Sequence, residues 1–398
     1  MRRLFSLLVA ASLLVCVLSS SVSAAETVTI NVYNWGQYIA DGTDDSIDVI
    51  DEFESAYPNI KVNYMTFDSN ESMYTKLKAG GSTFDIIIPS DYMVQKLMDE
   101  DMLEPLDFAN IPNFEYIDDS FKNLAYDPEN LYSVPYTWGS VGVIYNTKYV
   151  SPEDIGGWDL LWNEKYAGKI LMFDNPRDAF AIAELELGYS INTENSTLLT
   201  LSSNKLREQK PLVQGYVMDQ IFDKMQRGEA WIAPYYAGDY LTMVEENPDL
   251  GFYFPEEGFN LFVDAICIPK GAEHKAEAET FINFLISPEI CAQNLEYLGY
   301  SAPSTEAKAL MDPETAENPI AYPEEETLAR GDSFKSLSLQ STQEMNSLWL
   351  TVKTADNSTT VYLILTAAAI CLVVFLWIFF KVRKRKRKAH RCAKWKAA

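Results

Sequence analysis

The strongest constraint on the fold of this sequence is a repeated alternation of short strand-like segments with amphipathic helical segments, beginning at Val28. Val28, Ile30 and Val32 alternate with polar residues, as in a strand that buries one face. Residues 84–88 form a short apolar run, which is typical of a parallel strand covered on both faces. Apolar residues at helical spacing follow each of these segments. This alternation predicts an α/β chain with one or two mainly parallel sheets.

The alternation continues through the second half of the chain. We expect strands at residues 169–173, 231–236 and 263–268, and helices at residues 179–187, 220–225 and 276–286. The sequence has 398 residues, which is more than one ordinary domain needs and enough for two. We therefore expect two α/β units.

Residues 1–24 have the pattern of a secretory signal peptide. Two arginines precede an apolar run over residues 4–18, and small residues follow around Ala24. We therefore expect this segment to direct export and to be removed. Cys16 raises the alternative of a lipoprotein signal, although Val15 stands where that signal needs a small residue.

Residues 361–380 contain no charged residue and are long enough to span a hydrocarbon core of about 30 Å as a helix. Residues 381–398 hold ten Lys or Arg and no acidic residue, which predicts a cytoplasmic tail. We expect a transmembrane helix at 361–380, a polar stalk at 353–360, and the main domain on the periplasmic or extracellular face of the cell membrane. A buried helix and a nucleic-acid-binding tail are the alternatives. The basic block beside an apolar span argues against both.

The expected exported domain is strongly acidic. Two of the 32 basic residues lie in the predicted signal and ten in the predicted tail, which leaves 20 against 57 acidic residues, a formal net charge of −37. Such a charge argues against nucleic acid as a partner and favours cations, whose local concentration it raises. Solubility is the plainer explanation for most of this charge.

The expected exported domain has few residues suited to metal or redox chemistry. Its cysteines, Cys267 and Cys291, form no CxxC pattern and are either paired or free thiols. Its one histidine is His274, which leaves little for histidine-based hydrolysis or zinc binding. The sequence also lacks a GxSxG motif. We expect no catalytic residue, no metal site and no cofactor, and we expect that the chain is not an enzyme.

Aromatic and acidic residues gather where the expected strands end. They stand at residues 33–38, 89–92, 174–178, 235–239, 262–264 and 299–300. In open α/β sheets the ligand lies beyond the carboxyl ends of the strands. Rings that cover methylene groups and attract cations, together with separated carboxylates, suit a flexible alkyl chain that carries ammonium groups.

Five short motifs follow one another along the chain: residues 33–38 (YNWGQY), 69–80 (SNESMYTKLKAG), 85–92 (DIIIPSDY), 132–139 (YSVPYTWG) and 298–304 (LGYSAPS). In these motifs the chain resembles the spermidine/putrescine-binding proteins of bacterial ABC importers, and the resemblance extends over residues 29–349. It implies a type II periplasmic-binding-protein fold, in which two α/β lobes close over a ligand about a hinge. The implied first lobe comprises 27–136 and 261–305, and the implied second lobe comprises 137–260 and 306–352. The chain would cross near 136–139 and return near Phe262.

The resemblance also implies a set of ligand-binding residues. They are Trp35, Gln37, Tyr38, Ser90, Tyr92, Asn175, Asp178, Tyr236, Asp239, Phe262, Asp264 and Tyr300. Gln37 stands where relatives carry an acidic residue, and Asn175 stands where spermidine binders often carry Asp. The carboxylates that remain are those of Asp178, Asp239 and Asp264. They suffice for a diamine and are marginal for a triamine, which tilts the expectation from spermidine toward putrescine.

The resemblance implies a monomeric substrate-binding protein that captures a polyamine and delivers it to the permease subunits of an ABC importer. A membrane-anchored polyamine receptor is one alternative, although a tail of 18 residues is short for a signalling domain. An extracellular enzyme and a binder of carbohydrate or iron on the same fold are the others.

Overall fold

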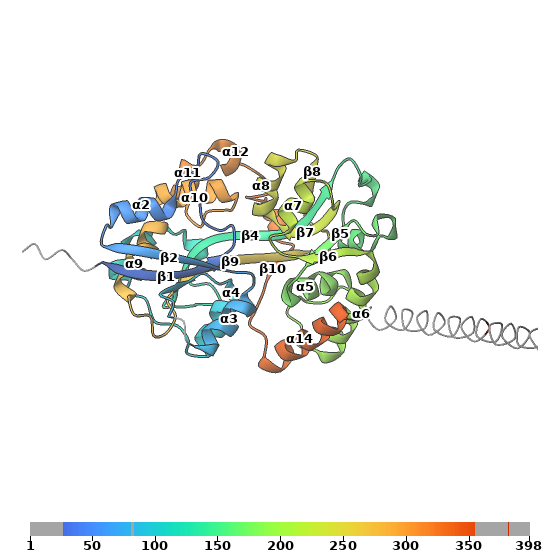
Figure 1. Cartoon of the computed structure of the whole chain (residues 1–398), viewed down its shortest axis with the longest axis horizontal. Coiled ribbons are helices and arrows are strands. Elements are labelled where there is room, and N and C mark those ends of the chain that lie inside the picture. The colour runs from blue at the N-terminus through green and yellow to red at the C-terminus, as the bar shows by residue number, and fades with distance from the viewer. Residues whose placement is uncertain (1–26, 81–82, 355–380, 382–398) are drawn as a thin grey trace, which may run out of the picture.

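The computed structural model of the chain describes residues 27–80, 83–354 and Lys381 (Figure 1). The predicted signal at 1–24 and the predicted membrane span at 361–380 lie outside these residues. So do residues 355–360 of the predicted stalk and the predicted tail beyond Lys381. Among the residues that are described, no helix is both long and apolar enough to cross a membrane.

In the described part of the chain, ten strands form one continuous sheet. Eight of them follow one another in the order β2 (Ile60–Phe67), β1 (Val28–Trp35), β3 (Ile86–Ile87), β9 (Phe259–Cys267), β4 (Ser133–Asn146), β7 (Ile232–Tyr236), β5 (Ile170–Phe173) and β6 (Val213–Val217). β8 (Leu250–Tyr253) pairs with β4, and β10 (Gly331–Ser333) pairs with β9. The outer strands are parallel, β1 with β2 and β3, and β5 with β6 and β7, as the sequence predicts.

Two long antiparallel strands, β4 and β9, connect the two halves of the sheet. Residues 133–140 of β4 pair with β9, and residues 141–146 pair with β7 and β8. β9 in turn bonds to β3 at Cys267 and to β10 from Phe259. The chain therefore divides into two lobes joined through these strands, which contain both implied crossing points, 136–139 and Phe262.

Helices cover both sides of each half of the sheet (Figure 1). In the first lobe they are α2 (Val49–Ala56), α3 (Asn70–Ala79), α4 (Asp91–Asp99), α9 (Lys275–Leu285), α10 (Pro288–Leu298), α11 (Thr305–Leu310) and α12 (Pro313–Ala316). In the second lobe they are α5 (Pro176–Glu186), α6 (Ser196–Gln209), α7 (Ile221–Gln226), α8 (Ala237–Glu246) and α14 (Leu339–Thr354). The short helix α13 (Glu325–Leu328) precedes β10. The predicted helices at 179–187, 220–225 and 276–286 correspond to α5, α7 and α9.

Each lobe has its own apolar core. In the first lobe, adjacent residues of β3 face opposite sides: Ile86 packs with Phe53 and Phe281, whereas Ile87 packs with Met73. The apolar run at 84–88 is therefore covered on both faces, as predicted. The second lobe has one large core around β5 and β7, which includes residues of α5, α6, α8 and α14.

The structure corrects two details of the predicted organisation. Ala307 and Met311 are buried in the core of the first lobe, so α11 packs there although residues from 306 onward were expected in the second lobe. The stalk, predicted from 353, begins later because α14 extends to Thr354. Lys353 forms an ion pair with Asp174, which ties this end of the helix to the second lobe.

The structure also decides between the alternatives for the two cysteines of the domain. Cys267 lies in β9 and Cys291 in α10, and both are buried free thiols. Burial raises the pKa of the Cys291 thiol to about 12, so this thiol is uncharged at neutral pH. Both cysteines therefore act as small apolar core residues.

Asn294 in α10 is fully buried and joins separate segments of the first lobe. Its Oδ1 accepts a hydrogen bond from the backbone N–H of Ala40 at 2.9 Å, and its Nδ2 donates to the hydroxyl of Tyr136 at 2.8 Å. That hydroxyl donates to the carbonyl oxygen of Tyr38 at 2.9 Å. This network fixes the turn after β1 against β4.

Replacing Asn294 with Ala should lower the free energy of unfolding by about 2–4 kcal/mol, because it leaves the buried N–H of Ala40 without an acceptor and opens a small cavity. Urea denaturation of the described domain measures this difference. Gln293→Ala changes the exposed neighbour in the same helix and should shift the free energy by less than about 0.5 kcal/mol. Equal unfolding curves for the two variants would contradict the role of this network.

Candidate functional site

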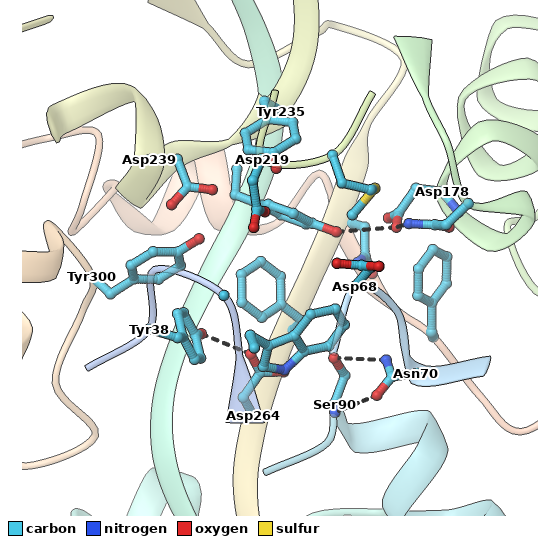
Figure 2. A pocket seen from close by; sticks show the side chains of 18 of the residues that line it. Tyr38, Asp68, Asn70, Ser90, Asp178, Asp219, Tyr235, Asp239, Asp264 and Tyr300 are labelled. Carbon is cyan, nitrogen blue, oxygen red and sulfur yellow. Dashed lines mark hydrogen bonds between the residues drawn. The ribbon is translucent and has the colours of Figure 1, made fainter. Parts of the chain in front are cut away.

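A cavity lies between the two lobes, where β4 and β9 connect them (Figure 2). Its walls are formed by Trp35, Gly36, Tyr38, Asp68, Asn70, Ser90 and Tyr92 from the first lobe, by Asn175, Asp178, Met218, Asp219, Tyr235, Tyr236, Asp239 and Phe334 from the other side, and by Asn260, Phe262, Asp264 and Tyr300. Five of these residues are aspartates, and none of them is Lys, Arg or His.

The cavity brings together eleven of the twelve residues expected to bind ligand, and the exception is Gln37. Gln37 has a φ of 51°, and its side chain lines two neighbouring surface clefts. The residues on either side of the turn, Trp35 and Tyr38, do face the cavity. Gln37 therefore does not line this cavity, and a contact of Gln37 with a ligand stays a prediction.

Asp264 is held on β9 and is only 4% exposed. Its Oδ2 accepts a hydrogen bond from the hydroxyl of Tyr38 at 2.7 Å, whereas its Oδ1 has no partner among the described residues. Burial raises the pKa of this carboxyl to about 6, and the hydrogen bond from Tyr38 opposes the shift. A buried carboxylate oxygen without a partner is costly, so this group can bind a cation or a donor from a ligand.

Asp178 lies in the first turn of α5, where Asn175 is the N-cap residue. Oδ1 of Asn175 accepts the backbone N–H of Asp178 at 2.8 Å, and its Nδ2 donates to the Asp178 carboxylate. The hydroxyl of Tyr236 donates to the same carboxylate oxygen at 3.2 Å. Burial raises the pKa of Asp178 to about 6, and these hydrogen bonds oppose the shift. Asn175 therefore orients Asp178 as well as lining the cavity.

Asp239 lies in the first turn of α8 and is 9% exposed. Burial raises its pKa to about 8, while a hydrogen bond with Tyr300 opposes the shift. A Cβ atom on Gly238 would lie 2.4 Å from a ring carbon of Tyr300, so only glycine at 238 leaves room for that ring beside Asp239. In Figure 2, Asp239 and Asp178 lie on opposite sides of the cavity, with Asp264 below them.

Aromatic rings form a continuous surface between these carboxylates. The ring of Phe262 lies 5.5 Å from that of Tyr236 and 6.4 Å from that of Tyr300, and Tyr300 lies 5.0 Å from Tyr38, all in edge-to-face contact. A Cβ atom on Gly139 would lie 2.7 Å from the tip of the Phe262 ring, so glycine on β4 makes space for it. This surface can cover methylene groups and attract cations, at about 0.5–2 kcal/mol for each ring.

Some residues of the cavity were missed in the sequence. Asn70 donates from Nδ2 to the hydroxyls of Ser90 and Tyr92, both at 3.1 Å, and so fixes two of the predicted residues. Asp68 follows β2 and Asp219 follows β6, which places both at the carboxyl ends of parallel strands. The rule that ligands lie beyond strand ends could have found both aspartates.

Comparison with known proteins agrees with the fold. A family model described as bacterial extracellular solute-binding protein matches residues 48–323. The spermidine/putrescine-binding periplasmic protein of Escherichia coli strain K12 is 32% identical over 314 residues, covering 79% of this chain and 88% of the relative. The putrescine-binding periplasmic protein SpuD of Pseudomonas aeruginosa is 28% identical, covering 86% of this chain and 97% of the relative.

A solved structure, a putative spermidine/putrescine ABC transporter from Listeria monocytogenes, is 37% identical and superposes with a TM-score of 0.78. The match covers 82% of this chain and 99% of that chain. Fold and sequence therefore agree over almost the whole length of these relatives. The chain belongs to the bacterial extracellular solute-binding proteins, and it is a binding protein rather than an enzyme.

Proposed function

We propose that this chain is the polyamine-binding protein of an ABC importer, which captures a linear polyamine between its lobes and delivers it to the permease. The observation that carries the proposal is the arrangement of buried carboxylates around a continuous aromatic surface, with one carboxylate oxygen of Asp264 unpartnered. The relatives described above carry spermidine and putrescine in their names, which supports the same reading.

The chemistry of the cavity favours ammonium groups over neutral solutes. A primary ammonium group donates three hydrogen bonds and a secondary one donates two, and both neutralise carboxylates that are otherwise costly to ionise in a buried place. Asp178 and Asp264 provide such carboxylates. The ring of Phe262 lines the same cavity and can pack against the methylene groups of a ligand that contacts both. A sugar would leave this negative charge unpaired, and this disfavours carbohydrate as the ligand.

Ligand binding is expected to favour closure of the lobes. Asp178 and Tyr236 belong to the second lobe, whereas Trp35 and Tyr38 belong to the first. A ligand that contacts both sets binds the closed form more tightly than the open form, and so shifts the population toward closure. The closed form is then the species that a permease would recognise.

We also propose that a helix over residues 361–380 holds the domain at the outer face of the membrane. The support lies in the sequence: no charge occurs in 361–380, and ten basic residues follow in 381–398. In this arrangement α14 leads from the second lobe toward the membrane, and the short remaining stalk keeps the site close to a permease.

Removal of residues 355–398 should convert the exported protein from membrane-bound to soluble. Fractionation of cells that express the full chain or the shortened chain measures the distribution, with antibody detection in each fraction. The full chain should sediment with membranes until detergent is added. Equal amounts of both chains in the soluble fraction would contradict the proposed anchor, although not the proposed ligand.

Replacing Asp264 with Asn should weaken polyamine binding at least about fivefold, a loss of about 1 kcal/mol, because the change removes a charge-assisted hydrogen bond with little change of shape. Calorimetric titration with putrescine and spermidine measures the affinity. Asp223→Asn removes one charge from an exposed ion pair of the second lobe and should change the affinity less than twofold. Absence of binding by the unmodified protein at millimolar polyamine would overturn the proposed function itself.

Polyamine affinity should rise with pH between about 5 and 8. Without ligand, burial holds the pKa values of Asp178 and Asp264 at about 6, so both carboxyls are partly protonated at the acidic end of this range. The amines stay protonated throughout, as the pKa of about 10 for Lys indicates. Binding must therefore release protons from the carboxyls. Titrations at pH 6 in two buffers of different ionisation enthalpy measure this release, and identical heats in both buffers would contradict it.

A further inference from the structure

Two carboxylates of the cavity are not among the residues that the resemblance implies. Asp68 follows β2 in the first lobe and Asp219 follows β6 in the second. Figure 2 shows both among the side chains that line the cavity. Within the described part of the chain, neither takes part in a salt bridge. Their negative charges are therefore not balanced by a Lys or Arg of the described protein.

Gly36 brings Asp219 close to the first lobe. A Cβ atom on Gly36 would lie 2.4 Å from Oδ2 of Asp219, which is far below a normal contact distance. Gly36 is the first residue after β1 and precedes Gln37, whose side chain turns away from the cavity. The absent side chain at 36 thus leaves the space into which a carboxylate of the opposite lobe reaches.

Asp68 and Asp219 are close enough to influence one another. Both side chains are exposed at the edge of the cavity, and partial desolvation together with the negative charge of Asp68 raises the pKa of Asp219. Two like charges from opposite lobes therefore oppose closure when no cation lies between them. A cationic group bound beside them would remove this repulsion and join the lobes.

The same cavity holds a group that itself requires a ligand. Asp264 is 4% exposed, and its Oδ1 has no hydrogen-bond partner among the described residues. Asp178 and Asp239 complete the set expected from the sequence, to which Asp68 and Asp219 add two more carboxylates. A diamine supplies two positive charges, and a triamine supplies three. The two additional carboxylates can therefore share the one additional charge of a triamine.

On the basis of the proposed function, we propose that Asp68 and Asp219 form a further anionic subsite that receives the third cationic group of a linear triamine. The deeply buried carboxylates bind two ammonium groups of either ligand. The subsite beside Gly36 acts on the third, which a diamine lacks. The chain therefore selects triamines over diamines, the reverse of the preference that Gln37 and Asn175 suggest in the sequence.

Calorimetric titration of the full chain with spermidine and putrescine tests this selection. Spermidine should bind more tightly than putrescine to the unmodified protein. Asp219→Asn and Asp68→Asn should each weaken spermidine binding at least fivefold and putrescine binding by a clearly smaller factor, so that selectivity falls. Asp223→Asn, on the exposed face of α7, removes one charge from the same lobe and should leave the selectivity unchanged.

Gly36→Ala provides an independent test, because it leaves every charge in place and displaces the Asp219 carboxylate. It should lower selectivity for spermidine to a similar degree as Asp219→Asn. A chain that carries both Gly36→Ala and Asp219→Asn should lose little more selectivity for spermidine than either variant alone, since both changes act on the same contact.

Equal losses for spermidine and putrescine in the Asp219 and Asp68 variants, or additive losses in the double variant, would overturn the subsite and leave the proposed function standing. Tighter binding of putrescine by the unmodified protein would overturn the proposed selectivity. Failure of both amines to bind the unmodified protein would instead overturn the proposed function, and the subsite with it.

Discussion

The antiparallel pairing of β4 with β9 is the interaction on which the rest of the structure depends. These strands carry the hydrogen bonds that make the sheet continuous from one lobe to the other. They also build the floor of the cavity, since Phe262 and Asp264 belong to β9 and Gly139 on β4 gives the Phe262 ring its space. The same two strands, β4 and β9, therefore connect the lobes and form the base of the cavity.

Desolvation explains why this cavity favours a cationic ligand. The fold holds Asp178, Asp239 and Asp264 in buried positions where burial raises their pKa values, so ionisation there is disfavoured without a partner. Protein groups offset this cost only in part. The hydroxyl of Tyr38 donates a hydrogen bond to Oδ2 of Asp264, whereas Oδ1 has no partner among the described residues. A ligand with ammonium groups supplies what is missing, and a neutral ligand of the same shape does not. Selectivity thus arises from groups that the protein leaves incomplete.

The sequence predicted the parts of the structure that local pattern and strand order determine. Apolar residues on both faces of β3 predicted its burial, and the aromatic and acidic residues at strand ends predicted most of the cavity. Tertiary contacts decided the rest. Gln37 lies between two lining residues, yet its own side chain does not line the cavity. Ala307 of α11 packs in the core of the first lobe, and no local sequence pattern predicts this contact. Asp68 and Asp219 also follow strands, but only the packing of the two lobes brings them to one cavity.

The charge of such a cavity depends on carboxylates from distant parts of the chain as well as on those of a single motif. Within the motif at 33–38, Gln37 suggests that a negative charge has been lost from the site. In the structure, Asp219 from the other lobe approaches the same turn, and the glycine at 36 leaves room for it. A charge from the second lobe at this place differs from a charge on the turn itself, because its repulsion from Asp68 acts between the two lobes and would increase in the proposed closure. Where a carboxylate comes from therefore decides whether it merely attracts a cation or also makes closure depend on one.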